Sequence, residues 1–125
     1  MLDKKYYEDY EGEGRVKIWR EENGKEIGFV IWAGFFNAIL EGCFKPDFQR
    51  NGIIERYYNQ DGFYDEKWEM SHSDNVFEEL KAFDENLLNT KNKEMIKIAK
   101  EIIERLISFI NTAASKKEKV YVEYE

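Results

Sequence analysis

Two side chains in this sequence, Cys43 and His72, are of the kinds that most often carry chemistry in proteins. Each is the only residue of its type, so the chain can form no internal disulfide. A zinc site needs several cysteine or histidine ligands, which nearly excludes one here. A Cys–His dyad stays open because catalytic partners can lie far apart in sequence. We interpret Cys43 as a small buried apolar residue and His72 as a polar residue at the start of a helix.

Other catalytic and ligand-binding motifs are incomplete in this chain. The segment NQDGFYDEKWE is partly similar to a calcium-binding loop in which Gly62 would take the sixth position. Tyr57 and Trp68 would then take the first and twelfth positions, where oxygen ligands are required, so the match fails. The sequence has no GxxxxGK[ST] phosphate-binding loop, and no pair of carboxylates stands out for glycosidase chemistry. We expect no catalytic residue, no metal and no cofactor, and an enzyme using Cys43 or scattered carboxylates is the least favoured interpretation.

The acidic residues are unevenly placed along the chain, whose formal net charge is −7. Residues 61–85 contain nine acids and two lysines, so the net charge of this stretch alone equals that of the whole chain. Aromatic residues are interleaved with the acids, and a surface of this kind suits a basic, partly apolar partner. The carboxylates would pair with lysine or arginine, and the aromatic side chains would be anchors. The residues predicted to bind the partner are Asp61, Tyr64, Asp65, Glu66, Trp68 and Glu69, with Asp74 and Glu78 as outer charges.

The same acids also have a purely structural interpretation. Carboxylates are favourable near helix N-termini, which accounts for Asp74, Glu78 and Glu79 without any function. Phe77 and Phe83 stand where core residues would, and acids on an exposed hairpin are usually just solvated. The two interpretations differ in where the carboxylates lie after folding, because scattered or internally paired carboxylates would leave no binding face.

The strongest structural signal is the long apolar stripe of residues 91–116, which predicts one long helix. Its polar side offers Lys97–Glu101, Lys100–Glu104 and Glu101–Arg105 as pairs at i,i+4 spacing. The stripe consists of two rows of apolar residues: Met95, Ala99, Ile102, Leu106, Phe109 and Ala113, beside Ile96, Ile103, Ile107, Ile110 and Ala114. A stripe this broad requires a large apolar surface to cover it.

The first half of the chain predicts that surface as an antiparallel sheet. Residues 15–22 alternate in polarity, Asn23-Gly24 is a strong hairpin signal, and residues 25–36 run back as a strand that Gly34 breaks or bulges. Residues 36–44 are expected to form a further strand. Residues 53–70 read as a second hairpin with Asp61-Gly62 at its tip.

The second half predicts two helices and a last strand. Ser71, Ser73 and Asp74 are N-cap candidates for a helix of about three turns, carrying Val76, Leu80, Phe83 and Leu87 on its apolar side. The tail KVYVEYE alternates like a strand added to the sheet. The expected fold is therefore a single α+β domain: an antiparallel meander of about five to six strands, a short helix and one long C-terminal helix packed on a sheet face.

The length of 125 residues suits one domain, covering residues 1–125. Residues 1–13 are expected to form a charged, flexible arm that Tyr6, Tyr7 and Tyr10 could pin to the body. The N-terminal sequence lacks the apolar segment of a signal peptide, and residues 27–40 are too short an apolar run to span a bilayer. A cytoplasmic protein is expected. An acidic chain is repelled by phosphate backbones and anionic membranes, so the favoured partner is a basic protein.

In its overall profile the chain resembles bacterial immunity proteins and other protein inhibitors of nucleases. The resemblance lies in small size, acidity, an α+β pattern and the lack of catalytic motifs, and it carries no residue roles. It implies a bacterial protein that neutralises a toxin such as a nuclease, whose cationic active site an acidic surface can occupy. The alternative is a small-ligand-binding or homodimeric structural domain, with Trp19 and Trp32 lining a pocket.

Overall fold

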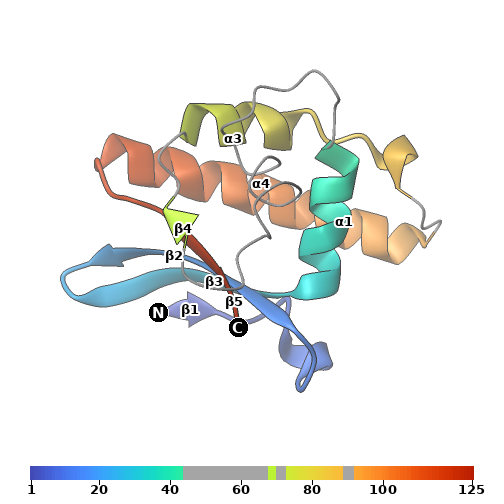
Figure 1. The fold of residues 1–125 in the computed structure, drawn as a ribbon, viewed down its shortest axis with the longest axis horizontal. Coiled ribbons are helices and arrows are strands. Elements are labelled where there is room, and N and C mark those ends of the chain that lie inside the picture. The colour runs from blue at the N-terminus through green and yellow to red at the C-terminus, as the bar shows by residue number, and fades with distance from the viewer. Residues whose placement is uncertain (44–67, 70–72, 89–91) are drawn as a thin grey trace.

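A computed structural model describes residues 1–43, 68–69, 73–88 and 92–125, with residues 73–75 described by their backbone only. The described parts form an α+β fold in which the α-helices lie on one side of a sheet (Figure 1). The elements in chain order are β1 (Leu2–Asp3), the 3-10 helix η1 (Glu8–Tyr10), β2 (Arg15–Glu22), β3 (Lys25–Trp32), α1 (Ala33–Cys43), β4 (Trp68–Glu69), α3 (Ser73–Lys81), the 3-10 helix η2 (Glu85–Leu87), α4 (Lys93–Ser115) and β5 (Tyr121–Tyr124).

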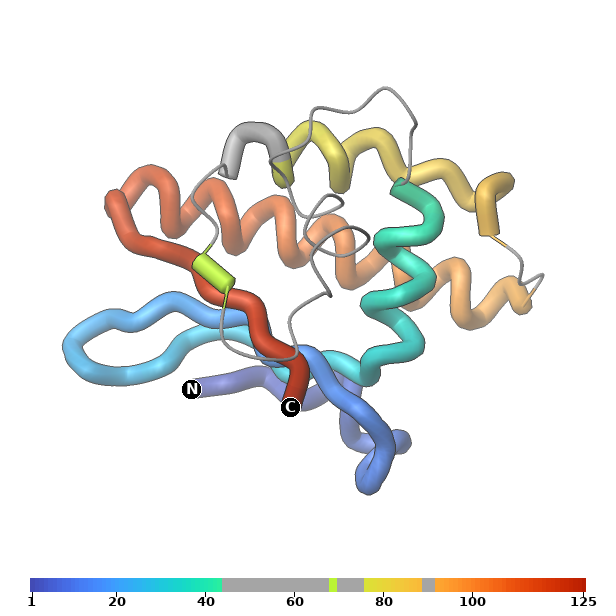
Figure 2. Tube along the Cα trace, in the orientation of Figure 1, coloured from blue at the N-terminus to red at the C-terminus, as the bar shows by residue number. Residues whose placement is uncertain are grey.

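The sheet is mixed, so the prediction of an antiparallel meander is only partly right. Its five strands stand in the order β1-β3-β2-β5-β4, and β1 runs parallel to β3 with Leu2 opposite Gly28. The remaining pairs are antiparallel. β5 lies between β2 and β4, so the end of the chain returns to the inside of the sheet (Figure 2). The predicted C-terminal strand is therefore confirmed.

The hairpin of β2 and β3 forms as the Asn-Gly signal predicts. Glu22 stands opposite Lys25, which leaves Asn23 and Gly24 as a two-residue turn. These two residues have φ angles of 52° and 76°. Both angles lie in the left-handed region that the primed hairpin turns require.

The core lies between the sheet and α4, which confirms the predicted long helix on a sheet face. The helix begins after Asn92, whose side chain accepts a hydrogen bond of 3.1 Å from the backbone N–H of Met95. Val16, Ile18, Ile31 and Val122 of the strands are buried in the same cluster as the helix. The buried residues of α4 are Ala99, Ile102, Ile103, Leu106, Ile110 and Ala113.

Residues 33–43 form helix α1, so the prediction of a strand over residues 36–44 is wrong for the part that the structure describes. The helix contacts α3, α4, η2 and the sheet, and seven of its eleven residues are buried. A helix covered on so many sides has a nearly continuous apolar sequence, which periodicity cannot distinguish from a buried strand. Cys43 at its end is fully buried, as predicted.

The predicted short helix is α3, and it ends earlier than its apolar pattern suggests. Val76 and Leu80 are buried, whereas Leu87 lies in η2 and is 41% exposed. The backbone N–H of Asp84 donates a 2.8 Å hydrogen bond to the Gly42 carbonyl of α1, which fixes the chain after α3. The second hairpin predicted over residues 53–70 lies outside the described residues, apart from β4.

The first ten residues pack against the body of the protein. Tyr6 and Tyr7 are 4% and 8% exposed, and the Tyr10 ring stacks on Trp32 with a centroid distance of 4.0 Å. The backbone N–H of Trp32 donates a 3.0 Å hydrogen bond to the Tyr6 carbonyl. These contacts fix η1 at the end of the sheet that lies beside the start of α1. Among the described residues, no helix is both long and apolar enough to cross a membrane.

Candidate partner-binding surface

Half of the predicted partner-binding residues lie outside the described part of the chain. These four are Asp61, Tyr64, Asp65 and Glu66. The other four are distributed over two elements: Trp68 and Glu69 form β4, and Asp74 and Glu78 belong to α3. Whether the eight residues share one face stays a prediction.

In β4 the two predicted site residues divide between the core and the surface. Trp68 is half-buried and packs against the hydrophobic core, so part of its ring is used inside the protein. Glu69 is exposed, and its carboxylate lies 3.4 Å from the Nζ of Lys119. An exposed ion pair of this kind is weak. It nevertheless places a cation of the protein itself beside the carboxylate.

The acids of α3 lie in opposite environments. Glu78 is exposed, as a partner-binding carboxylate must be. Its neighbour Glu79 is 3% exposed and stands between residues of the apolar core. A carboxylate buried to this degree contributes to the fold and cannot reach a partner's surface. For Asp74 the structure gives the backbone in α3.

The acids after α3 are engaged within the protein. The Asp84 carboxylate accepts a 2.9 Å hydrogen bond from the backbone N–H of Asn86 and so caps η2. The Glu85 carboxylate lies 3.2 Å from the Nζ of Lys100 in α4. Together with Glu69 and Glu79, these residues show that most of the acidic side chains described between residues 69 and 85 have contacts within the protein.

A second acidic segment has the opposite character. We define the N-terminal acidic turn as Glu8, Asp9, Glu11 and Glu13. All four side chains are exposed, and none forms an ion pair with any described residue. The turn itself is well ordered by Tyr7, whose hydroxyl donates a 2.9 Å hydrogen bond to the Glu13 carbonyl and accepts one of 3.3 Å from the Gly12 N–H. The turn therefore presents four free carboxylates on a fixed backbone.

The turn is attached to α4 by Arg105. The guanidinium donates hydrogen bonds of 2.6 Å to the Asp3 carboxylate and 3.3 Å to the Tyr6 hydroxyl. These two bonds raise the pKa of Arg105 above its ordinary value. The pKa of Asp3 is lowered. The larger cause is the hydrogen bond that its carboxylate accepts from the backbone N–H of Lys5, and the smaller cause is Arg105. Arg105 is thus a clamp between α4 and the segment that carries the acidic turn.

The ion pairs of α4 differ from the predicted i,i+4 pairs along the helix. Lys100 pairs with Glu85, and Arg105 pairs with Asp3. Glu101 lies 3.6 Å from Lys5. In each pair the helix contacts another part of the chain, because the neighbouring segments bring an opposite charge closer than the next turn of the helix does.

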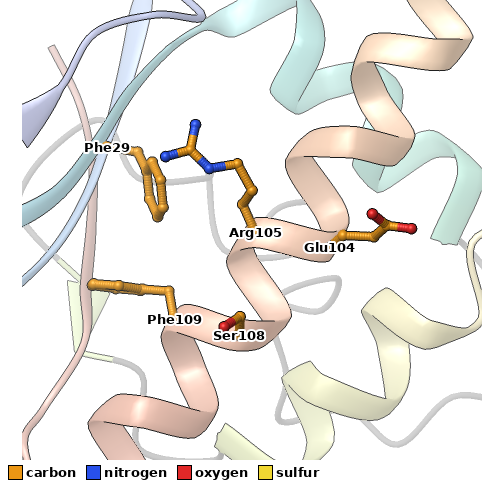
Figure 3. Close-up of a pocket in the computed structure, with 5 residues that line it drawn as sticks. All are labelled: Phe29, Glu104, Arg105, Ser108 and Phe109. Atoms are coloured by element: carbon orange, nitrogen blue, oxygen red, sulfur yellow. The ribbon is translucent and has the colours of Figure 1, made fainter.

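An open pocket of about 380 Å³ lies beside this clamp. Figure 3 shows Arg105 extending from α4 towards Phe29 of β3, with Phe109 near by and Glu104 pointing away. The Arg105 guanidinium lies 5.0 Å from the Phe29 ring centre, and the Phe29 and Phe109 rings meet edge to face at 5.4 Å. A site already occupied by the protein's own cation does not attract a basic partner, so we interpret this pocket as structural.

The described residues contain no group of three or more histidine, cysteine or acidic side chains that could hold a metal ion. Trp19, which could line a pocket in the alternative interpretation, is 3% exposed and packs beside Tyr121. Comparison with known proteins finds no matching family model, no matching curated protein and no matching solved structure.

None of the four acids of the N-terminal acidic turn is among the predicted partner-binding residues. The sequence shows four acids within residues 8–13, but this cluster by itself predicts only a charged, flexible arm. The signal for an ordered backbone is Tyr6, Tyr7 and Tyr10, because buried and half-buried tyrosines fix the backbone between them.

Proposed function

We propose that this protein is an acidic binding protein that neutralises a basic protein partner. The profile of immunity proteins makes a toxin such as a nuclease the favoured class of partner. The alternative, a small-ligand-binding or structural domain, stays a prediction.

One observation supports this proposal most strongly: the exposed carboxylates of the N-terminal acidic turn form no ion pair with any lysine or arginine of the described chain. A protein of net charge −7 gains long-range attraction to a cationic surface. Free carboxylates on an ordered backbone can then pair with lysine or arginine without first breaking an internal ion pair. Glu78 on α3 is a further exposed carboxylate that supports the proposal.

The mechanism requires two steps. Opposite charges steer the partner and speed the encounter, and contact area then holds the complex. Where the partner is a nuclease, the acidic surface would occupy the cationic groove that binds phosphate and so exclude the nucleic acid.

The experiment starts with affinity capture by the tagged protein, from the cells that make it, at low and at high salt. The captured protein is identified, purified and tested by biolayer interferometry. We expect a basic protein whose association rate falls steeply with salt, and whose activity is lost when one equivalent of this protein is added.

Two charge-reversed variants test the surface. Asp65→Lys with Glu66→Lys, or Glu8→Lys with Asp9→Lys, should each lower the association rate by about tenfold. Glu21→Lys, near the tip of the β2–β3 hairpin, is the control for a general change of charge and is compared with the single variant Glu8→Lys, which changes the net charge by the same amount. Recovery of no basic protein, or association unaffected by salt and by both reversals, would refute the proposed function.

A further inference from the structure

A pocket of about 430 Å³ lies between η1, α1 and α4. Its rim combines acids from two elements that are distant in sequence: Glu8 and Asp9 come from η1, and Glu94 and Glu101 come from α4. Its apolar lining includes Tyr10 and Ile98, both half-buried. The volume falls within the range of about 300–1,000 Å³ that is typical of ligand pockets.

The charges around this pocket are incompletely balanced. Two lysines also line it, and Lys5 lies 3.6 Å from Glu101. The second lysine, Lys97, forms no ion pair with the described residues. The same is true of three of the four acids that line the pocket: Glu8, Asp9 and Glu94. Three uncompensated carboxylates therefore share the pocket with one uncompensated ammonium group, which leaves an acidic rim around an aromatic and aliphatic lining.

The walls of the pocket are held in place before any partner binds. Arg105 fixes the N-terminal segment to α4 through Asp3 and Tyr6. Tyr10 stacks on Trp32 and meets Phe35 edge to face, with ring centres 5.4 Å apart. A pre-organised pocket loses little conformational entropy when it is filled.

We propose that this pocket receives an arginine side chain of the basic partner. Arginine fits the chemistry because its guanidinium can bond carboxylates in pairs and pack on an aromatic ring, while its stem covers apolar surface. The carboxylates of η1 and α4 bind the guanidinium, and Tyr10 and Ile98 contact the stem. The inference rests on the proposed function, and it names one contact between this protein and the basic partner.

The test is an NMR titration of the whole protein with N-acetyl-arginine amide, with N-acetyl-citrulline amide as the uncharged probe of similar shape. We expect saturable shifts at Tyr10 and Ile98, which line the pocket, with a dissociation constant of about 1–10 mM for the arginine probe. The citrulline probe should bind at least about threefold more weakly. Equal binding of both probes, or shifts that map away from the pocket, would overturn the proposal.

Three variants locate the effect. Glu94→Gln should weaken binding of the arginine probe by about 1.5- to 5-fold, and Lys97→Gln should strengthen it by a similar factor. Glu21→Gln removes the same charge at the opposite end of the sheet and should leave binding unchanged. If Glu94→Gln and Glu21→Gln weaken binding equally, the effect is one of total charge and the pocket is not the site. The titration needs no partner, so its failure is distinguishable from failure to find a basic partner.

Discussion

The N-terminal acidic turn and residues 69–85 are both rich in carboxylates, but the two regions use them differently. In the turn, four exposed acids form no ion pair with any described lysine or arginine. In the other region, Glu69 and Glu85 pair with lysines, Asp84 caps a 3-10 helix and Glu79 is buried. Among the acids of residues 69–85 whose side chains the structure describes, Glu78 is exposed and forms no ion pair with a described residue, like the acids of the turn.

The difference shows that acid content does not by itself locate a cation-binding face. A carboxylate is available to a partner when the fold exposes it and brings no internal cation to it. For the turn, the tyrosines hold the backbone while the carboxylates stay in water. For residues 69–85, lysines that are distant in sequence reach the acids only after folding.

The largest expected effect separates the neighbours Glu78 and Glu79. Glu79→Lys should lower the free energy of unfolding by about 3–5 kcal/mol, because it places a longer, cationic side chain at a buried position. Glu78→Lys changes an exposed residue and should cost less than about 0.5 kcal/mol. Urea unfolding followed by circular dichroism measures both. Equal, small effects would show that Glu79 is as available to a partner as Glu78, and the comparison would fail.

A smaller effect is expected at Asp84. Asp84→Ala removes the cap of η2 and should lower the free energy of unfolding by about 1 kcal/mol. Asp9→Ala is the matched change in the N-terminal acidic turn and should have almost no effect on stability, because its carboxylate is exposed and unpaired. A loss of stability from Asp9→Ala equal to that from Asp84→Ala would place the turn among the structural acids.

The fold was predictable from the sequence where an element is covered on one side. α4 exposes one side and buries the other, so its period is visible, and the Asn23-Gly24 turn has a specific backbone requirement. α1 was missed because burial on most sides removes the polar residues that reveal a helical period. β1 consists of two residues and carries no pattern of its own, so its parallel pairing with β3 is not visible in the sequence.

The candidate site was predictable only as an excess of charge. The sequence shows which residues are acidic, but the pairs Glu69–Lys119 and Glu85–Lys100 form between elements whose packing the sequence does not reveal. The pocket proposed for arginine combines η1 with α4, which are far apart along the chain. Such a site depends on tertiary structure.

Within the N-terminal segment, Asp3 should behave differently from the acids of the turn. Asp3→Asn weakens the bond to Arg105 and should lower the free energy of unfolding by about 0.5–1 kcal/mol, a modest loss because both side chains are partly exposed. Glu13→Gln, the control in the turn, should leave stability unchanged. An equal loss in the two variants would remove the distinction between clamp and free carboxylate.

The pH dependence of this effect has a definite sign. The pKa of Asp3 is lowered in the folded protein, so the unfolded chain takes up the proton first as pH falls. The stability difference between wild type and Asp3→Asn should therefore be full at neutral pH and shrink below about pH 4. Thermal unfolding at a series of pH values measures it, and a difference that grows on acidification would contradict the assigned contact.

The smallest effect concerns the exposed pair of Glu85 and Lys100, whose side chains are 46% and 53% exposed. A double-mutant cycle with Glu85→Gln and Lys100→Gln should give a coupling free energy of about 0.2–1 kcal/mol. This coupling should nearly vanish at about 1 M salt, where the screening length falls to about 3 Å. The control cycle of Glu13→Gln with Lys100→Gln should show no coupling at either salt concentration. A coupling of zero for Glu85 and Lys100 at low salt would make Glu85 as free as the acids of the turn. Residues 69–85 would then regain a carboxylate for the partner, and the distinction between the two regions would narrow to Glu69, Glu79 and Asp84.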